Sequence, residues 1–427
     1  MKKTLLAASA ALAACAVHAQ STVEIYGTAD VGAETTNRTA GVNPLLRSNV
    51  GRKERLAPSM SGISALGFRG TEDLGGGMRA GFVLEMQPTY DEGTLGNDGR
   101  AWGRQAFVSL TTPYGEIRLG RQYAPFFYAK AFSTTERLAG TDLFTGLLTI
   151  NQLQVRQDNQ VSYWLKAGKF TGSIAVSPNA GVGAAGINGR RAATGATGST
   201  AQILGGQTAG AEGRGRTAGA FINYADNPGP GGQGVSVSAA VHTNRFDVPL
   251  YLGPTATLAN GLPVGVLDDY RSYVLAGRYI AASGWAVAAA FGEGSYDFKS
   301  SAFPTLVSDG IDIRSFAVGA RYTFGVWQVG AMYGIQKFKN FTKGKDTAFV
   351  LGADYNLSKR TALYTRYGYL KDDEGRTLPV SATAGINGGP EPLLVATGLR
   401  EVPVWNGVGV NPGGKSTSFS IGIRHTF

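Results

Sequence analysis

The feature that most constrains this chain is a series of short segments in which apolar and polar residues alternate. Sixteen such segments, each about ten residues long and bounded by turn residues, follow one another from Thr22 to Phe427. A period of two residues is that of a β-strand with one apolar and one polar face. The chain is therefore predicted to be all-β and antiparallel.

The connections between these segments alternate between short and long. Five tight turns are predicted at residues 75–77, 112–114, 167–169, 283–284 and 357–359, and long loops near residues 34–60, 124–157, 179–215, 245–269 and 372–415. One edge of the sheet thus carries turns and the other carries loops. This asymmetry is typical of outer-membrane barrels, which have short periplasmic turns and long external loops.

The composition limits the other classes of protein. Only 16% of the 427 residues are charged, and no stretch beyond the N-terminus approaches the roughly 18 apolar residues that a membrane helix requires. The 18 Tyr, 20 Phe and 5 Trp residues argue against a disordered chain. A soluble β-sandwich has the same period of two and remains an alternative, although a closed barrel pairs every backbone group within a membrane.

Residues 1–19 are predicted to be a cleaved signal peptide, which leaves residues 20–427 as one barrel domain. Lys2 and Lys3 precede an apolar run that ends in the small residues before the expected cleavage after Ala19. A lipidation site at Cys15 is the alternative. The predicted mature chain has no cysteine and two histidines, His242 and His425. This inventory excludes Cys nucleophiles and His/Cys zinc sites, so no metal or cofactor is expected.

The last segment shows the alternation clearly. Phe419, Ile421 and Ile423 share one face, together with His425, and the intervening residues are small, polar or charged. In a membrane barrel the apolar face contacts lipid and the polar face lines the lumen. The chain ends on this pattern, at Phe427.

Several motifs resemble those of the Gram-negative general porins, in particular the beta-proteobacterial type. They span residues 23–30, 65–77, 104–108, 119–122, 351–361 and 422–427. The resemblance implies a 16-stranded antiparallel transmembrane β-barrel with an inward-folded third loop. It also implies a homotrimer in the outer membrane, surrounded by lipid and lipopolysaccharide. Phe427 resembles the signal that the outer-membrane insertion machinery recognises.

Charged residues are expected to form the pore constriction. Arg69 lies on the polar, lumen-facing parity of its segment, and Arg104 and Arg156 match basic positions of the family. Glu136 and Asp142 are the acidic residues of the third loop. Opposed charges across a water-filled constriction create a field that selects among ions and polar solutes.

Each of these charges also has a simpler interpretation. An arginine in the lumen or in a loop can be solvated without selecting anything, and Glu136 or Asp142 can pair with Lys130 or Arg137 inside the loop. Ala65 stands where many relatives have arginine, so the expected excess of positive charge is small. The sequence therefore predicts a weak preference for anions.

The predicted function is passive diffusion of ions and small hydrophilic solutes through a water-filled channel. A substrate-specific outer-membrane channel is the alternative, but the sequence shows no dense aromatic run on lumen-facing positions. The basic residues Arg47, Arg52, Lys53 and Arg55 of the first loop are expected at the external mouth or against lipopolysaccharide phosphates. A surface adhesin or receptor is a third possibility.

Two motifs suggest other chemistry, and neither is favoured. Residues 409–416 match the phosphate-binding loop pattern, but that loop requires a following helix, and the remaining residues alternate like a strand. A barrel lipase would need a Ser–His pair. His425 lies on the lipid-facing parity, and His242 has no neighbouring serine and carboxylate in the sequence. Neither an enzyme nor a nucleic-acid-binding protein is expected.

Overall fold

A computed structural model describes most of the predicted barrel. The described residues are 22–40, 50–97, 99–133, 156–180, 215–227, 232–252, 263–301, 308–340, 344–373, 380–381 and 414–427. The predicted signal peptide, residues 1–19, lies outside them. In this part of the chain, no helix has both the length and the apolar character needed to cross a membrane.

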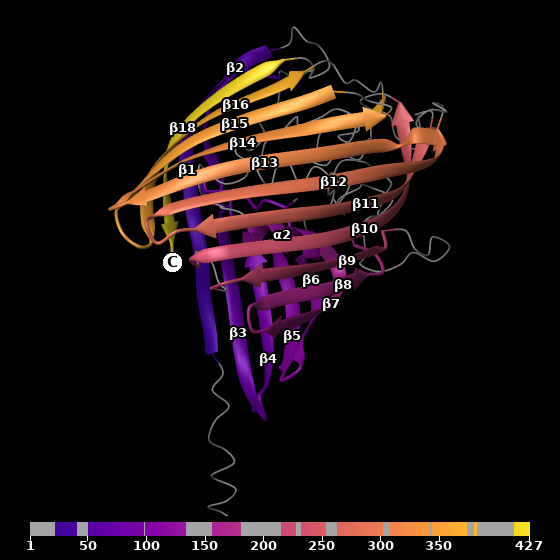
Figure 1. Cartoon of the computed structure of the whole chain (residues 1–427), viewed down its shortest axis with the longest axis vertical. Helices are drawn as coiled ribbons and strands as arrows, with labels where there is room; N and C mark the ends of the chain where they lie inside the picture. The colour runs from indigo at the N-terminus through magenta and orange to yellow at the C-terminus, as the bar shows by residue number, and fades with distance from the viewer. Residues whose placement is uncertain are drawn as a thin grey trace, which may run out of the picture.

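Sixteen antiparallel strands form a closed ring, which confirms the predicted barrel (Figure 1). The first half consists of β1 (Thr22–Ala40), β3 (Ala65–Gly75), β4 (Met78–Met86), β5 (Gln105–Thr112), β6 (Gly115–Tyr123), β7 (Arg156–Ala167), β8 (Phe170–Ser177) and β9 (Thr217–Ala225). The second half consists of β10 (Gly234–Leu252), β11 (Pro263–Ile280), β12 (Trp285–Ser301), β13 (Ile311–Phe324), β14 (Trp327–Asn340), β15 (Gly344–Asn356), β16 (Thr361–Asp373) and β18 (Lys415–Thr426). Pairing of β1 with β18 closes the ring.

Two short strands extend the sheet on the side of the long loops. β2 (Val50–Pro58) pairs with the later part of β1, beyond the stretch where β1 pairs with β3. β17 (Val380–Ser381) pairs with the end of β10. The predicted loop at residues 34–60 is therefore partly wrong, because β1 continues to Ala40. An ion pair between Arg55 and Glu34, 2.7 Å long, supports this extension.

The predicted loop at residues 245–269 is shortened in the same way. β10 continues to Leu252 and β11 begins at Pro263, and the two strands remain paired as far as Tyr251 and Pro263. Paired strands satisfy each other's backbone N–H and C=O groups, so a strand can continue beyond the end of its alternating pattern. The pattern alone therefore does not show where the strand ends. The sequence therefore located the connections correctly but made the strands too short.

The exposed outer face of each strand is apolar and the inner face is polar, which is the reverse of the arrangement in a water-soluble protein. On β1, Val23 and Ile25 are 70% and 60% exposed. On β18, Phe419 and Ile421 are exposed whereas the intervening Ser420 is buried. An apolar outer wall around a polar interior requires a hydrocarbon environment. This arrangement rules out the soluble sandwich.

Aromatic side chains gather on the outer wall near the short turns. Trp285 packs against Tyr322, Tyr322 against Phe324, and Trp327 against Tyr355. Amphipathic rings of this kind prefer the boundary between hydrocarbon and water. The rings therefore mark one edge of the apolar band.

A helix follows β6 and packs inside the barrel. This helix, α2 (Pro125–Ser133), begins the predicted third loop and contacts β8, β9, β10 and β11. Tyr128 packs against Trp164 and Phe221, which both lie on lumen-facing positions. The rest of that loop, with Glu136 and Asp142, lies outside the described residues.

Candidate functional site

Two of the predicted constriction arginines meet at one tyrosine. Arg104 and Arg156 donate hydrogen bonds to the Tyr123 hydroxyl, at 2.7 and 3.0 Å. The guanidinium carbon of Arg156 also lies 4.6 Å from the centre of the Tyr123 ring. A cation over an aromatic face is attracted by the ring's negative quadrupole. Tyr123 therefore holds two like charges close together on the lumen wall.

The strand pairing explains why these three side chains converge. Tyr123 ends β6 and is paired with Arg156, the first residue of β7. Arg104 directly precedes β5, and its backbone N–H donates to the carbonyl of Glu85 on β4. All three residues thus lie at the loop-side ends of neighbouring strands. We call them the Arg104–Tyr123–Arg156 cluster.

The acidic partner of Arg104 comes from the barrel wall. The Nε of Arg104 lies 2.5 Å from Oε1 of Glu85, and both side chains are buried. The hydroxyl of Tyr26, on β1, donates to the other oxygen of Glu85 at 3.0 Å. Sequence reasoning missed Glu85. Its signal was present, because Glu85 is a lone carboxylate within the apolar run 82–86.

A second carboxylate, Asp158, holds two more arginines. Arg100 pairs with Asp158 at 2.8 Å, and Arg121 pairs with the other carboxylate oxygen. Arg156 is fixed from the same side by a 3.0 Å hydrogen bond to Asn97. Arg121 belongs to the porin-like motif at residues 119–122, and Asp158 was not among the predicted site residues. Arg121 and Asp158 are brought together by the pairing of β6 with β7, whereas Arg100 reaches Asp158 from the loop before β5, which has no repeating pattern.

Arg69 faces the lumen, as its parity predicted, but it is already paired. It donates to both oxygens of Glu24, at 2.8 and 2.9 Å, and its guanidinium carbon lies 4.9 Å from the centre of the Tyr26 ring. Such an exposed ion pair contributes at most about 1 kcal/mol to stability. Arg69 therefore reaches the cluster only through Tyr26 and Glu85.

The described charges around the cluster do not balance. There are five arginines and three carboxylates. The arginines are Arg69, Arg100, Arg104, Arg121 and Arg156, and the carboxylates are Glu24, Glu85 and Asp158. Nη1 of Arg104 and Nε of Arg156 are buried and have no hydrogen-bond partner among the described atoms. This part of the lumen wall is therefore positive and has donors left over.

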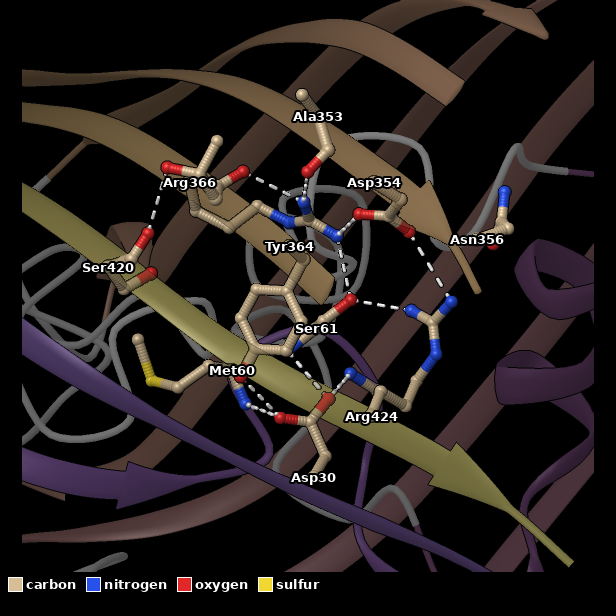
Figure 2. A network of polar contacts seen from close by, with 12 residues as sticks. Asp30, Met60, Ser61, Ala353, Asp354, Asn356, Tyr364, Arg366, Ser420 and Arg424 are labelled. Carbon is tan, nitrogen blue, oxygen red and sulfur yellow. Dashed lines mark hydrogen bonds and ion pairs between the residues drawn. The ribbon is translucent and has the colours of Figure 1, made fainter. Parts of the chain in front are cut away.

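A second polar network lies across the seam where the barrel closes (Figure 2). The carboxylate of Asp30 accepts hydrogen bonds from the backbone N–H groups of Met60, Ser61 and Gly62 and from the Tyr364 hydroxyl. The segment between β2 and β3 is thereby fixed inside the barrel. This network was not predicted, since its members are far apart in the sequence.

Aromatic side chains in the lumen are packed rather than presented to water. Phe126, Tyr270 and Tyr296 are fully buried, and Phe221 is nearly so. Phe126 lies against His242, and Tyr270 lies against Tyr296. The rings support α2 and the upper wall. They do not form an exposed aromatic surface on which a substrate could slide.

The two alternative chemistries find no support in the described residues. Lys415 and Ser416 of the phosphate-loop pattern open β18, so a strand follows the motif where a helix would be needed. His242 is buried against Phe126 and Tyr270, and its ring nitrogens have no hydrogen-bond partner among the described atoms. His425 is exposed on the outer face and contacts Thr361.

Comparison with known proteins places these features in one family. The family model described as Gram-negative porin matches residues 6–375. Outer membrane porin protein 32 of Delftia acidovorans is 28% identical over all of both chains. An outer membrane porin protein of Bordetella pertussis is 33% identical over 38% of this chain and 44% of its own.

Solved structures share the fold. The anion-selective porin from Comamonas acidovorans has a TM-score of 0.65 and 23% identity, and the match covers 96% of this chain and all of the other. The trimer form of OmpT, an outer membrane protein of Vibrio cholerae, has a TM-score of 0.58 and 13% identity, covering 95% and 99% of the two chains. At these identities the structures establish the fold alone.

Proposed function

Because the chain belongs to the Gram-negative porin family, we propose that it lets ions and small hydrophilic solutes diffuse passively across the outer membrane, with a weak preference for anions. The protein lies in the outer membrane, as its relatives do. The family and the fold are those of channels, not enzymes.

The observation that carries the ion preference is the excess of arginine around Tyr123. Arg104 and Arg156 share one tyrosine oxygen, and of the two only Arg104 pairs with a carboxylate among the described residues. In a channel of low local dielectric an excess positive charge attracts anions and repels cations. The solved porin from Comamonas acidovorans is anion-selective by name, which agrees with the proposal.

The test is the zero-current potential of the channel in a KCl gradient across a planar bilayer. We expect a weak anion preference that declines as salt rises, because salt shortens the range of the field to about 8 Å at physiological ionic strength. The double variant Arg104→Ser, Arg156→Ser should move the potential towards cations and raise the single-channel conductance.

A matched control is Arg271→Ser, since Arg271 is an arginine on the outer wall that pairs with Asp297. It should leave the potential unchanged. A cation preference in the unmodified channel, or an unchanged potential in the double variant, would reject the proposal.

General diffusion is favoured over a substrate-specific channel because four aromatic side chains of the described lumen, Phe126, Phe221, Tyr270 and Tyr296, are buried. Neutral sugars and zwitterionic amino acids at millimolar concentration should leave the current unchanged. Saturable inhibition by one such solute would instead indicate a specific channel.

Three barrels are proposed to associate, as in the trimer form of the Vibrio cholerae protein. The outer wall contacts lipid or a second barrel at every position, and its exposed apolar side chains suit both. Lipopolysaccharide is the proposed neighbour at the loop side, where the first loop carries the exposed Arg52. Phe427 is the proposed signal for the insertion machinery.

A further inference from the structure

A second group of arginines faces the lumen near the short turns. Arg278 on β11, Arg321 on β13, Arg366 on β16 and Arg424 on β18 all lie within about five residues of a turn or of the chain end. Their outer-face neighbours Tyr279, Tyr322, Tyr367 and Ile423 set the parity that turns the arginines inward. We call these four residues the turn-side arginine group.

Within this group, Arg321 lies across the lumen from the Arg104–Tyr123–Arg156 cluster. In the ring of sixteen strands, β5 and β13 are eight strands apart in either direction. Arg104 precedes β5, and Arg321 belongs to β13. Arg104 and Arg321 are therefore carried by opposite walls, and a solute in the lumen passes between them.

Carboxylates neutralise only part of the turn-side group. Asp354 lies 2.5 Å from Arg366 and 3.3 Å from Arg424, so it is shared by two guanidinium groups (Figure 2). Asp30, the other carboxylate in this network, is already held by Tyr364 and three backbone N–H groups. Arg366 and Arg424 thus share one carboxylate, and Arg321 forms no ion pair with a carboxylate among the described residues.

Arg321 and Arg366 each have an unused donor, and Arg321 is the more weakly paired of the two. It lies within electrostatic range of Arg278 and Asp354. Its Nε is buried and has no hydrogen-bond partner among the described atoms, and the same is true of Nε of Arg366. A buried donor without an acceptor is costly, and an anion entering the lumen would supply the missing acceptor.

Small residues separate these arginines along the wall. In the strand register Arg278 is opposite Ala288, which is opposite Gly319, and Arg321 is opposite Gly330, which is opposite Gly352. These positions share the lumen-facing parity. Gly330 and Gly352 are partly exposed and carry no side chain, so on that side of Arg321 the wall leaves room for a solute, whereas Ala288 and Gly319 on the other side are buried.

We propose that the turn-side arginine group is a second anion-binding site, specific for small oxyanions that carry at least two negative charges, such as phosphate or a dicarboxylate. Guanidinium groups bind such oxyanions through paired N–H donors. The proposal rests on the proposed diffusion function and adds a binding step on the turn side of the lumen. Binding must be weak enough for the ion to leave again.

The test compares inorganic phosphate with chloride at constant ionic strength. With the unmodified channel, phosphate should reduce the chloride current in a saturable way and raise the thermal unfolding midpoint of the detergent-solubilised protein. For each of these two effects, we measure the phosphate concentration that gives half of the maximal change. In the double variant Arg278→Gln, Arg321→Gln this concentration should rise about tenfold, since two charge-assisted contacts are lost. Succinate serves as the carboxylate probe.

Two further variants keep the test interpretable. Arg314 lies on β13, as Arg321 does, but faces outward and pairs with Glu293. The variant Arg314→Gln should therefore bind phosphate as the unmodified protein does. Arg278→Lys with Arg321→Lys keeps both charges and should retain much of the effect if the double glutamine variant fails to fold. Equal phosphate effects in the unmodified protein and in the glutamine double variant would overturn the proposal.

The outcome is separable from that of the proposed function. The variant Arg104→Ser, Arg156→Ser changes the zero-current potential but should shift the phosphate midpoint much less than the Arg278 and Arg321 double variant does. A channel that prefers cations would reject the weak anion preference, whereas an unaltered phosphate midpoint in the Arg278 and Arg321 variants would reject the second site alone.

Discussion

A single carboxylate, Glu85, determines how much of the charge of Arg104 acts on the lumen. Glu85 accepts from Arg104 on one oxygen and from Tyr26 on the other. Because the pair is buried, water screens it little. The selectivity of the site therefore depends as much on this wall residue as on the arginines that the sequence had indicated.

Replacement of Glu85 by glutamine should strengthen the anion preference. The variant keeps the shape of the side chain but removes the negative charge that faces Arg104, so the zero-current potential in a KCl gradient should move further towards anions. The amount of folded protein should fall as well, because an unpaired buried charge costs about 3–5 kcal/mol.

The control for this prediction is Glu293→Gln. Glu293 also pairs with an arginine, Arg314, but lies on the outer wall. Its replacement should leave the potential unchanged. A Glu85→Gln channel with the potential of the unmodified protein would show that Arg104 does not contribute to the field.

At the scale of secondary structure, the seam between β1 and β18 depends on the last residue. The backbone N–H and C=O of Phe427 bond to the C=O and N–H of Gly27, at 3.1 and 3.0 Å. A side-chain carbon at Gly27 would lie 2.6 Å from the Phe427 ring. Gly27 is thus covered by the ring of Phe427 from its own chain.

Deletion of Phe427 should sharply lower the amount of protein inserted in the outer membrane. The deletion removes both the proposed recognition signal and two hydrogen bonds that close the ring. Quantitative immunoblotting of outer-membrane fractions measures the effect. Phe427→Tyr, which keeps an aromatic end, should insert normally, and normal insertion of the deletion variant would contradict the prediction.

Gly422 provides space for the tyrosine that binds Asp30. A side-chain carbon at this position would lie 2.3 Å from the Tyr364 hydroxyl, so Gly422→Ala must displace the ring from Asp30. Overpacking of this kind costs about 1–3 kcal/mol. Unfolding in urea should show the loss, while Gly277→Ala, whose new carbon meets nothing closer than 3.7 Å, should be nearly neutral.

Two short turns on neighbouring hairpins are joined by Asp226. The Val235 N–H, and then Lys169 and Tyr224, lower the pKa of Asp226 to about 2 from its usual 3.8. A depressed carboxylate pKa stabilises the fold above the usual value, and this contribution is lost as pH falls towards 2. The difference in unfolding midpoint between the unmodified protein and Asp226→Asn should therefore be constant above about pH 5 and vanish near pH 2.

For the whole molecule, the sixteen-stranded ring with an apolar outer wall predicts how the protein behaves in detergent. We expect an SDS-resistant trimer that dissociates on boiling, because closed barrels unfold only when the whole hydrogen-bonded ring opens. Gel mobility with and without heating, with light scattering in mild detergent, measures this. A monomer in mild detergent would contradict the proposed assembly.

The sequence by itself determined that the chain is all-β, how many long strands it has and which residues share a face. These follow from the alternation of side chains, as in Phe419 and Ile421 against Ser418 and Ser420, which is a local property of each strand. The alternation also predicted correctly that Arg69 faces the lumen. It placed the connections within a few residues, but not the extension of β1 to Ala40, which depends on pairing with β2.

Only the tertiary structure decided which charges meet. Glu85 reaches Arg104, and Asp158 reaches Arg100 and Arg121, because strands and a non-repeating loop bring them together. The contact of Asp30 with Tyr364 joins residues 334 positions apart. The alternation of apolar and polar residues predicts the face of the sheet on which a side chain lies. It does not predict which side chains of other strands that side chain contacts. Closure of the sheet fixes those neighbours, and with them the electrostatics of the lumen.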